Sequence, residues 1–404
     1  MNKVLFLAGG LPHYFIPVLN KINALPNVCV EILITENKSE TVGAAVHQNI
    51  KGNNFPVHFL PEQKQWYGKS FFVNLTDKLD EIKPNAIFVV WPYSLAFVFN
   101  FKLKKHIKKH NIKLVNRDIP FQVPLFNKTF EYYSKTPPID ENLSVVLSSK
   151  GIKNKIYILF LKYLRKLLYK KFDAHALYTQ RGKEVIASYG VDEKKIFFIG
   201  NSIDTEPLLK INNELQFAEP ILKNNSHRIL HVGRLVKWKR VDLLIEAVAK
   251  LKEKFADIEL LVIGNGPEKN NLMQLAETLN VSKNVVFVGG VYDDKLLAQY
   301  TKASSVYVLA GMGGLSINEA MCLAKPIIIS VCDGTEDVIV KENRNGFYFK
   351  ENDCDDLVAK VDILLSDKEK CEKFGQESLN IINTEMNINV LMENYKIIFK
   401  YLFN

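Results

Sequence analysis

Residues 228–239 read RILHVGRLVKWK, and this stretch decides how the second half of the chain is organised. Arg228–Val232 is typical of a buried strand, Gly233 turns the chain, and a helix is expected from about Lys239. Arg234 and Lys239 would then both lie at the carboxyl edge of a sheet. There, a guanidinium fork and an ammonium point charge would suit a diphosphate. The alternative is two surface cations on a basic protein.

A second glycine-rich stretch lies downstream, where residues 309–321 read LAGMGGLSINEAM. The pattern predicts a strand, a loop with three glycines in four residues, and a helix. Glycines let a ligand approach the backbone, and the first N–H groups of a helix make an anion site. Glu319 falls in the first turn of that helix. Its carboxylate either binds a ligand or only interacts favourably with the helix dipole.

Short apolar runs alternate with amphipathic segments through both halves of the chain, which favours doubly wound parallel sheets. The expected strands are Val4–Leu7, Val28–Ile34, Val57–Leu60, Ala86–Val90, Leu114–Val115, Arg228–Val232, Glu259–Ile263, Val285–Val288, Ser305–Leu309 and Pro326–Ser330. The expected helices include Pro17–Ala24, Ser94–His110, Lys239–Phe255, Glu268–Leu279, Lys295–Lys302 and Ile317–Leu323. We predict two α/β domains, residues 1–204 and 205–375, with a ligand cleft between them.

Composition excludes some classes of protein. The chain has 404 residues, of which 47% are hydrophobic and 24% charged, so it is not wholly disordered. No apolar run approaches the roughly 18 residues that span a bilayer, which excludes a polytopic membrane protein. The first 19 residues are interrupted by glycine, proline and histidine, so we expect a buried strand there and not a signal peptide.

Five cysteines, Cys29, Cys322, Cys332, Cys354 and Cys371, lack the spacing of metal ligands and predict reduced thiols in a cytoplasmic protein. Asp293 and Asp294 also suggest a metal site, but without further ligands we interpret them as a helix cap.

The net charge is +9, which favours phosphate-rich partners. Lys150–Phe172, KGIKNKIYILFLKYLRKLLYKKF, has an apolar and a basic face at helical pitch. It is either a helix lying on an anionic membrane or an ordinary helix packed on a sheet with its lysines in water. No nucleic-acid binding motif accompanies the positive charge, so no nucleic-acid partner is expected.

The second half resembles the retaining nucleotide-sugar glycosyltransferases of the GT-B fold, in the large family-4 class of glycosyl transferases group 1. The likeness covers about Tyr178–Asp367. It rests on ordered motifs: Val232–Leu235 with Lys239, Gly264–Pro267, Val285–Gly289, Gly314–Leu315 with Glu319–Met321, and Pro326. It implies two Rossmann-like domains facing a cleft, an N-terminal domain that binds the acceptor, and a final segment, residues 376–404, whose helix returns to that domain.

The resemblance also implies roles for individual residues. Arg234 and Lys239 would hold the donor diphosphate and replace a divalent metal, so neither a metal nor another cofactor is expected. The backbone of Gly313, Gly314, Leu315 and Ser316 would hold phosphate oxygens, and Glu319 the ribose hydroxyls. The backbone from Gly289 to Val291 would face the base. Gly9 and Gly10 would border the donor from the other domain, although such a pair is also typical of a plain turn.

Two departures from the family pattern concern the donor sugar. The acid that usually lies eight positions before the second glutamate is Gly311 here, so sugar recognition must differ or activity is lost. The histidine that the family often has in the N-terminal domain is replaced by Arg117, in Asn116–Pro120. Arg117 would contact the sugar or the acceptor, or form a salt bridge with Asp118 or another acid. His13 is an alternative sugar contact.

We therefore expect a retaining enzyme that transfers a sugar from a UDP- or GDP-sugar to a hydroxyl of a glycan or lipid-linked acceptor. Bacterial surface polysaccharide or glycoconjugate assembly is the expected setting, at the inner face of the plasma membrane if the basic helix docks there. A non-catalytic GT-B protein that binds a nucleotide or a partner is the main alternative, and a sugar-nucleotide epimerase is less consistent with Gly311.

Overall fold

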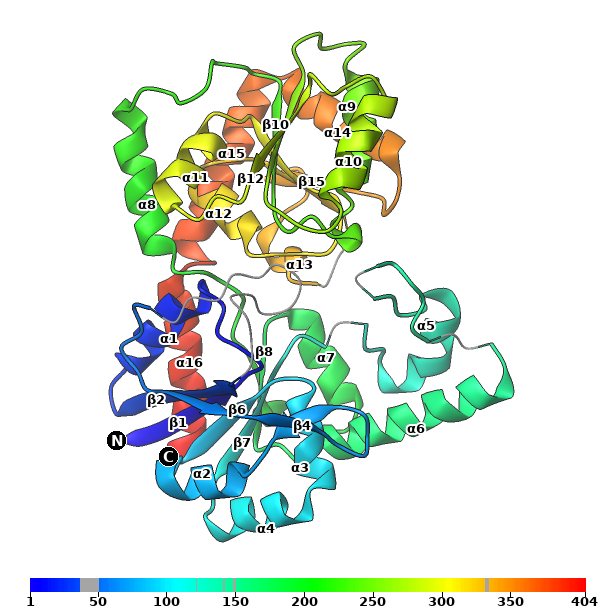
Figure 1. The fold of residues 1–404 in the computed structure, drawn as a ribbon. Helices are drawn as coiled ribbons and strands as arrows, with labels where there is room; N and C mark the ends of the chain where they lie inside the picture. The colour runs from blue at the N-terminus through cyan, green and yellow to red at the C-terminus, as the bar shows by residue number, and fades with distance from the viewer. Residues whose placement is uncertain (37–50, 121, 141, 148–149, 331–333) are drawn as a thin grey trace. The chain divides into compact units, whose positions relative to one another are not determined.

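The computed structural model describes residues 1–36, 51–120, 122–140, 142–147, 150–330 and 334–404, with only the backbone at residue 217. Contacts divide the chain into two compact α/β units (Figure 1). The N-terminal unit is Met1–Ile139, Val145–Gly200 and Asn389–Asn404, and the C-terminal unit is Asp140–Ser144 and Asn201–Ile388. The predicted boundaries after residues 204 and 375 thus differ from the observed changes after Gly200 and Ile388.

The N-terminal unit is built on a parallel sheet with the strand order β3-β2-β1-β6-β7-β8-β9. These strands are β1 (Asn2–Leu7), β2 (Val28–Thr35), β3 (Val57–Leu60), β6 (Ala86–Val89), β7 (Lys113–Asp118), β8 (Ala174–Leu177) and β9 (Ile196–Phe198). An antiparallel pair, β4 (Glu62–Lys64) and β5 (Ser70–Phe72), lies outside it. The predicted parallel sheet is confirmed, and β1 is buried from Val4 to Leu7.

Helices of the N-terminal unit follow the expected alternation with one difference. They are α1 (Phe15–Asn23), α2 (Leu75–Ile82), α3 (Ala96–Phe99), α4 (Phe101–Lys109), α5 (Thr129–Lys135), α6 (Ile152–Tyr169) and α7 (Gln180–Ser188). The helix predicted over Ser94–His110 is interrupted at Asn100. Its backbone is extended, and its side chain accepts a hydrogen bond from the Leu103 N–H to cap α4.

The C-terminal unit is built on a second parallel sheet, with the strand order β12-β11-β10-β13-β14-β15. Its strands are β10 (Arg228–Val232), β11 (Glu259–Ile263), β12 (Val285–Gly289), β13 (Val306–Leu309), β14 (Ile327–Ser330) and β15 (Gly346–Phe349). The chain passes from β10 to β11 and β12 on one side, then crosses to β13 on the other. The carboxyl ends of β10 and β13 therefore form a topological switch point, where open α/β sheets bind ligands.

Helices cover both faces of this sheet. They are α8 (Thr205–Glu214), α9 (Val241–Leu251), α10 (Lys269–Thr278), α11 (Asp294–Lys302), α12 (Ser316–Cys322), α13 (Glu336–Ile339), α14 (Cys354–Leu365) and α15 (Lys368–Thr384). Leu260 and Val262 of β11 pack with α9, α10 and α14, while Leu261 and Ile263 pack with α8, α11, α12 and α15. This alternation is why the strand is apolar throughout: both of its faces are buried.

The last helix, α16 (Ile388–Phe403), packs in the N-terminal unit, as expected from the resemblance. Its Tyr395 and Phe399 rings lie 6.2 and 6.0 Å from the ring of Phe88 in β6. The Asn394 side chain donates a hydrogen bond to the Ile199 carbonyl at 3.1 Å. The C-terminal segment thus completes a core formed by the beginning of the chain.

Candidate functional site

Two loops meet at the switch point of the C-terminal sheet. The first follows β10 and contains Gly233–Lys239, and the second follows β13 and contains Ala310–Leu315. The two strands are hydrogen-bonded neighbours although about 75 residues separate them in sequence. The site is therefore assembled by sheet topology.

Backbone hydrogen bonds to the end of β11 and the loop after it hold the first loop in place, and glycines allow the close approach. The Gly233 N–H donates to the Ile263 carbonyl at 3.0 Å, and the Leu235 N–H donates to the Asn265 carbonyl at 3.0 Å. A Cβ atom on Gly264 would lie 1.9 Å from the Gly233 carbonyl oxygen, and one on Gly266 would lie 2.3 Å from that of Leu235. The Gly264–Pro267 motif thus serves close backbone packing beneath the loop.

Gly311 packs against the backbone of the first loop. A Cβ atom at this position would lie 2.0 Å from the Trp238 carbonyl oxygen, and the next residue's N–H, that of Met312, donates to the same oxygen at 2.8 Å. The sequence marked Gly311 as the position where the family has an acid. The structure adds a physical reason for glycine, because the first loop occupies the space that a side chain would need.

Lys239 joins the two loops. It lies in the short 3₁₀ turn Lys237–Lys239, is buried, and donates from Nζ to the carbonyls of Met312 and Gly313, both at 2.6 Å. A Cβ atom on Gly314 would lie 3.2 Å from this ammonium. The predicted helix start at Lys239 is displaced, since α9 begins at Val241. Arg234 is half-buried in the same loop.

The second loop presents backbone donors beside this ammonium. The N–H groups of Gly313, Gly314, Leu315 and Ser316 have no hydrogen-bond partner among the residues that the structure describes. The Ser316 hydroxyl is 2.7 Å from the hydroxyl of Tyr307, a buried residue of β13. One ammonium and four unpaired N–H groups close together are chemically suited to bind an anion.

Glu319 lies in the first turn of α12, as predicted. It is partly buried, and this burial, reinforced by the nearby charge of Asp294 at the start of α11, raises the pKa of its carboxyl group to about 7. Near neutral pH the side chain is thus divided between the acid and the carboxylate. Asp293 caps α11 by accepting from the Leu296 N–H at 2.7 Å, which confirms the predicted cap.

Gly289 and Val291 lie at the carboxyl end of β12, which is separated from β10 by β11. Gly289 ends β12 with a positive φ of 91°, and its carbonyl accepts from the Gly264 N–H at 2.8 Å. Val291 is partly buried and packs against the core on the α11 and α12 face. Both residues belong to the same carboxyl edge as Lys239.

The remaining predicted residues lie in the N-terminal unit. Gly9 and Gly10 follow β1, and His13 is exposed just before α1. Arg117 ends up among aromatic rings. Its guanidinium carbon is 4.0 Å from the ring centre of Phe15 and 5.1 Å from that of Tyr178, and it forms no salt bridge with a described acid. The predicted salt bridge with Asp118 is therefore wrong.

His231 is a residue that the sequence analysis did not single out. It is fully buried in β10, with Nδ1 3.2 Å from the Val308 carbonyl and no partner for Nε2 among the described residues. Burial, together with the charge of Lys239, lowers its pKa to about 4, so the ring is neutral. A Cβ atom on Gly233 would lie 3.3 Å from Nε2. The only sequence signal was a polar residue inside an otherwise apolar strand.

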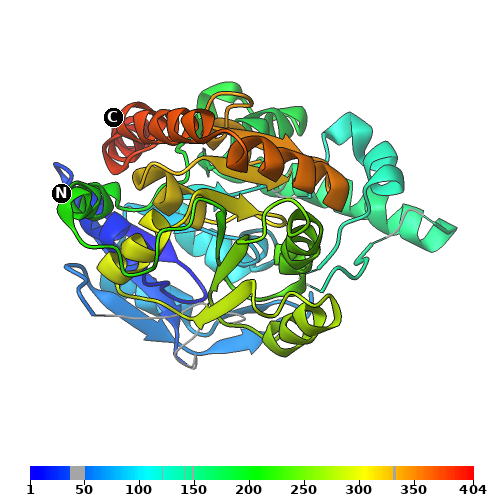
Figure 2. The ribbon, with the colours of Figure 1, turned by 90° about the horizontal axis from the view of Figure 1, so that it is seen from above.

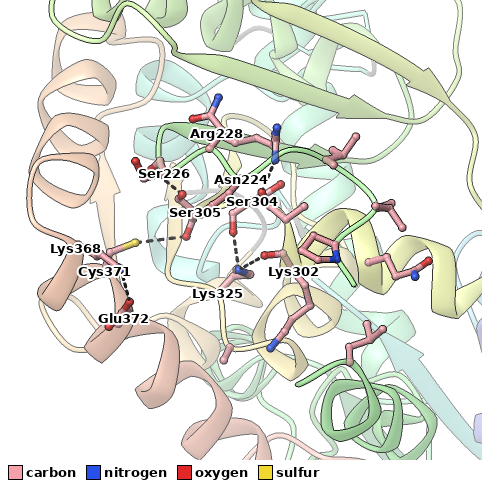
Figure 3. A pocket seen from close by; sticks show the side chains of 18 of the residues that line it. Asn224, Ser226, Arg228, Lys302, Ser304, Ser305, Lys325, Lys368, Cys371 and Glu372 are labelled. Atoms are coloured by element: carbon pink, nitrogen blue, oxygen red, sulfur yellow. Dashed lines mark hydrogen bonds and ion pairs between the residues drawn. The ribbon is translucent and has the colours of Figure 1, made fainter. Parts of the chain in front are cut away.

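A pocket of about 680 Å³ lies at the amino ends of the strands of the same sheet (Figure 3). Its lining includes Ser226, Ser305 and Pro326, which precede β10, β13 and β14. The partly buried Lys325 donates to the carbonyls of Lys302 at 3.0 Å and Ser304 at 2.5 Å, and burial lowers its pKa to about 8. Since α/β sheets bind ligands at the carboxyl ends of strands, we do not assign the donor to this pocket.

The described cysteines carry no disulfide, and one group of possible metal ligands lies in the N-terminal unit. Cys29, Cys322, Cys354 and Cys371 are free thiols, and Cys332 lies outside the described residues. Within the described part of the chain, Asp80, His106 and His110 of the N-terminal unit form a group of metal-ligating side chains. No described helix has the length and apolar character needed to cross a bilayer.

The contact at Gly311 predicts the cost of a methyl group there. Gly311→Ala forces the two loops apart, and we expect it to destabilise the C-terminal unit by about 1–3 kcal/mol, the usual cost of overpacking. Thermal unfolding followed by circular dichroism measures this as a drop of several degrees in the midpoint. Gly314→Ala is the control, because the atom nearest to its added Cβ is the side-chain nitrogen of Lys239, at 3.2 Å, and not a backbone atom at 2.0 Å. An equal midpoint for both variants would contradict the close approach.

Residues 212–380 match the family of glycosyl transferases group 1. An uncharacterized glycosyltransferase of Methanocaldococcus jannaschii is 28% identical over 271 residues, which cover 66% of this chain and 68% of that protein. For two further uncharacterized glycosyltransferases, from Haemophilus influenzae and M. jannaschii, the chain spans 55% and 64% of the relative's length.

Solved structures show the same fold over the full chain. A Staphylococcus aureus TarM variant in complex with fondaparinux, α-GlcNAc-glycerol and UDP has a TM-score of 0.67 at 12% identity, covering all of both chains. HepE of Anabaena in complex with UDP has a TM-score of 0.66 at 15% identity, covering 98% of each chain. Identities this low show the fold alone. The family match adds a class for part of the chain: residues 212–380 match glycosyl transferases group 1, and the chain as a whole has the GT-B fold.

Proposed function

We propose that the chain transfers a sugar from a nucleoside-diphosphate sugar, with UDP or GDP as the nucleotide, to a hydroxyl group of a glycan or lipid-linked acceptor. The observation that carries this proposal is the contact of Lys239 Nζ with the Met312 and Gly313 carbonyls. It places a buried cation beside the four unpaired N–H groups of the following residues. The donor diphosphate supplies the matching negative charge. The UDP in the TarM and HepE complexes favours UDP over GDP.

The negative charge that develops on the diphosphate during sugar transfer accounts for the cations and N–H groups of the two loops. As the bond between the anomeric carbon and the diphosphate oxygen breaks, the diphosphate gains negative charge and the sugar becomes oxocarbenium-like. Lys239 and the backbone N–H groups are held in place before the reaction, so they would stabilise the leaving group without reorganisation, and Arg234 of the same loop would add a second positive charge. We propose that this set of donors replaces a divalent metal in the reaction.

Retention of the anomeric configuration is the second part of the proposal. The acceptor hydroxyl would attack the face from which the diphosphate leaves and pass its proton to the departing diphosphate oxygen. A covalent intermediate would need a nucleophile against the anomeric carbon. Gly311 provides no such side chain at the position where the family usually has an acid. Front-face attack therefore accounts for retention with the residues of this loop.

The other predicted residues would complete the donor site. Glu319 would accept hydrogen bonds from the ribose hydroxyls, and the backbone from Gly289 to Val291 would face the base. Gly9 and Gly10 would border the donor from the N-terminal unit. Because position 311 carries no carboxylate, the donor sugar would be recognised by other groups. His13 and Arg117 are candidates for contacts with the sugar or the acceptor.

The setting that we propose is the assembly of bacterial surface polysaccharide or another glycoconjugate, on the cytoplasmic side of the plasma membrane. The alternative is a GT-B protein that binds a nucleotide or a partner without catalysis. The feature that favours the alternative is the glycine at 311. Turnover of a donor separates the two proposals, because a non-catalytic protein binds the nucleotide but releases no sugar.

Lys239, which is buried, and Lys237, which is exposed in the same 3₁₀ turn, provide a matched test of the proposed donor site. We expect UDP, or another nucleoside diphosphate from a panel with GDP and ADP, to raise the thermal midpoint of the wild type. Lys239→Gln should abolish this shift, whereas Lys237→Gln, an exposed neighbour in the same turn, should keep it. Proton NMR of the product from the matching α-linked sugar nucleotide then reports its anomeric configuration. No stabilisation by any nucleotide, or an inverted product, would contradict the proposal.

The raised pKa of Glu319 predicts a pH-dependent nucleotide affinity. If the carboxylate is the form that binds ribose, the binding-competent fraction of the free protein rises about tenfold between pH 6 and pH 8, and Kd falls by up to that factor. Calorimetric titration of UDP across this range measures the slope. Glu319→Gln should bind more weakly and should lose this component of the pH profile. A slope shared by both proteins would assign it to the nucleotide and not to Glu319.

A further inference from the structure

Helix α6 carries its apolar stripe on the side that faces away from the protein. At about 100° per residue, six of its side chains fall within an arc of about 100°. All six are exposed: Ile152 by 77%, Ile156 by 64%, Leu159 by 43%, Phe160 by 55%, Tyr163 by 54% and Leu167 by 48%. We call these six residues the α6 stripe. The buried residues of α6, Ile158, Leu168 and Tyr169, lie on roughly the opposite side.

This arrangement does not fit the second of the two alternatives that the sequence left open, an ordinary helix whose apolar face packs on a sheet. A helix that packs on a sheet buries its apolar face, but α6 buries a separate set of residues, and Leu164 and Leu168 near its C-terminal end contact the N-terminal core. The N-terminal half of α6 extends outward from its unit in both views (Figures 1 and 2). Six exposed apolar side chains on one face of a helix form a contiguous patch, and such patches are typical of interaction sites.

The charges around the α6 stripe bear on the chemistry of a partner that could cover it. Residues 150–172 contain seven lysines and one arginine but no aspartate or glutamate. Lys153 lies on one side of the stripe, and Lys155, Lys162 and Lys166 on the other, at helical pitch. The ammonium groups of Lys162 and Lys166 lie 4.0 and 4.9 Å from the ring centre of Phe126, which holds them beside the stripe. An apolar strip bordered by lysines is complementary to acyl chains bordered by anionic headgroups.

We infer that α6 docks the protein on an anionic membrane surface, with the α6 stripe entering the boundary between headgroups and acyl chains. Tyr163 suits this depth because its ring is apolar and its hydroxyl polar. Docking would bring the N-terminal unit to the surface where a lipid-linked acceptor is presented. The inference concerns a different unit from the donor loops, so it stands or falls independently of the proposed nucleotide site.

Vesicle sedimentation tests this inference on the full chain. The wild type should pellet with vesicles of phosphatidylglycerol and phosphatidylcholine, and at least about tenfold more weakly with phosphatidylcholine alone. Ile156→Ser/Phe160→Ser/Tyr163→Ser should lose the binding, while its nucleotide-induced thermal shift stays that of the wild type. The control Met273→Ser/Val286→Ser/Ile363→Ser changes three apolar residues exposed elsewhere and should bind like the wild type.

Three outcomes would overturn the inference. The wild type fails to pellet with anionic vesicles, the stripe variant binds them as well as the wild type, or sedimentation equilibrium shows a wild-type dimer that the stripe variant loses. In the third case the α6 stripe is an interface between two copies of the chain. None of these outcomes changes the test of the donor site, which reads nucleotide binding alone.

A separate observation points to a metal site on the N-terminal unit. His106 and His110 are one turn apart at the end of α4, and both Nε2 atoms face Asp80 Oδ1 of α2, at 3.6 and 3.7 Å. All three ligand atoms lie within 4.8 Å of one another. In a tetrahedral zinc site with bonds of about 2.0 Å, ligand atoms are roughly 3.3 Å apart. The three groups are thus close to ligating positions, but too far apart to be hydrogen-bonded to one another.

The geometry points to a binding site for Zn²⁺ or a similar divalent transition metal, with water as the fourth ligand, that clamps α2 to α4. Two imidazoles and a carboxylate are ligands that zinc accepts. The site is remote in sequence from the donor loops, and no step of the proposed reaction uses it.

Calorimetric titration of Zn²⁺ into metal-free, untagged protein tests this site. We expect one ion per chain in the wild type, at least about tenfold weaker binding in Asp80→Asn and His110→Gln, and the visible absorption of tetrahedral Co²⁺ on substitution. His227→Gln is the control, since His227 also lies beside an acid, with Nδ1 2.6 Å from Asp257. Binding that is unchanged in Asp80→Asn and His110→Gln, or absent in the wild type, would overturn the assignment.

Discussion

The proposed donor site depends on one interaction, in which the Lys239 ammonium donates hydrogen bonds to the carbonyls of both Met312 and Gly313. Its donor and acceptors lie on loops that follow adjacent strands but are more than 70 residues apart in sequence. The bond therefore forms only when the sheet is assembled. A buried ammonium is costly unless it is hydrogen-bonded, and these two carbonyls help to offset that cost. The same charge then lies next to the N–H groups that would meet the diphosphate.

The rest of the C-terminal unit keeps these two loops together. Gly264 and Gly266 allow the loop after β11 to support the first loop from beneath, and Gly311 lets the second loop lie against it. Each of these contacts is between backbone atoms, so none tolerates a side chain. The order β11-β10-β13 brings all three loops to one edge of the sheet. Rigid packing of this kind is what preorganised electrostatic stabilisation of a leaving group requires.

Local patterns in the sequence were sufficient for the alternation of strands and helices, the cap at Asp293 and the place of Glu319 in its helix. Contacts between distant segments were not predictable. The steric reason for glycine at 311 depends on Trp238, and the Asp80 group depends on how α2 meets α4. For α6, periodicity showed an apolar face but not its direction, because a face turned to solvent and a face turned to the core give the same pattern.

Calorimetric titration of UDP and of uridine against the wild type and Lys239→Met tests the central claim most directly, because the two ligands differ only in the diphosphate. We expect the wild type to bind UDP at least about tenfold more tightly than uridine. Lys239→Met should lose most of this difference while its affinity for uridine stays similar. Equal affinities of the wild type for the two ligands, or an undiminished preference for UDP in Lys239→Met, would contradict a diphosphate site built on this lysine.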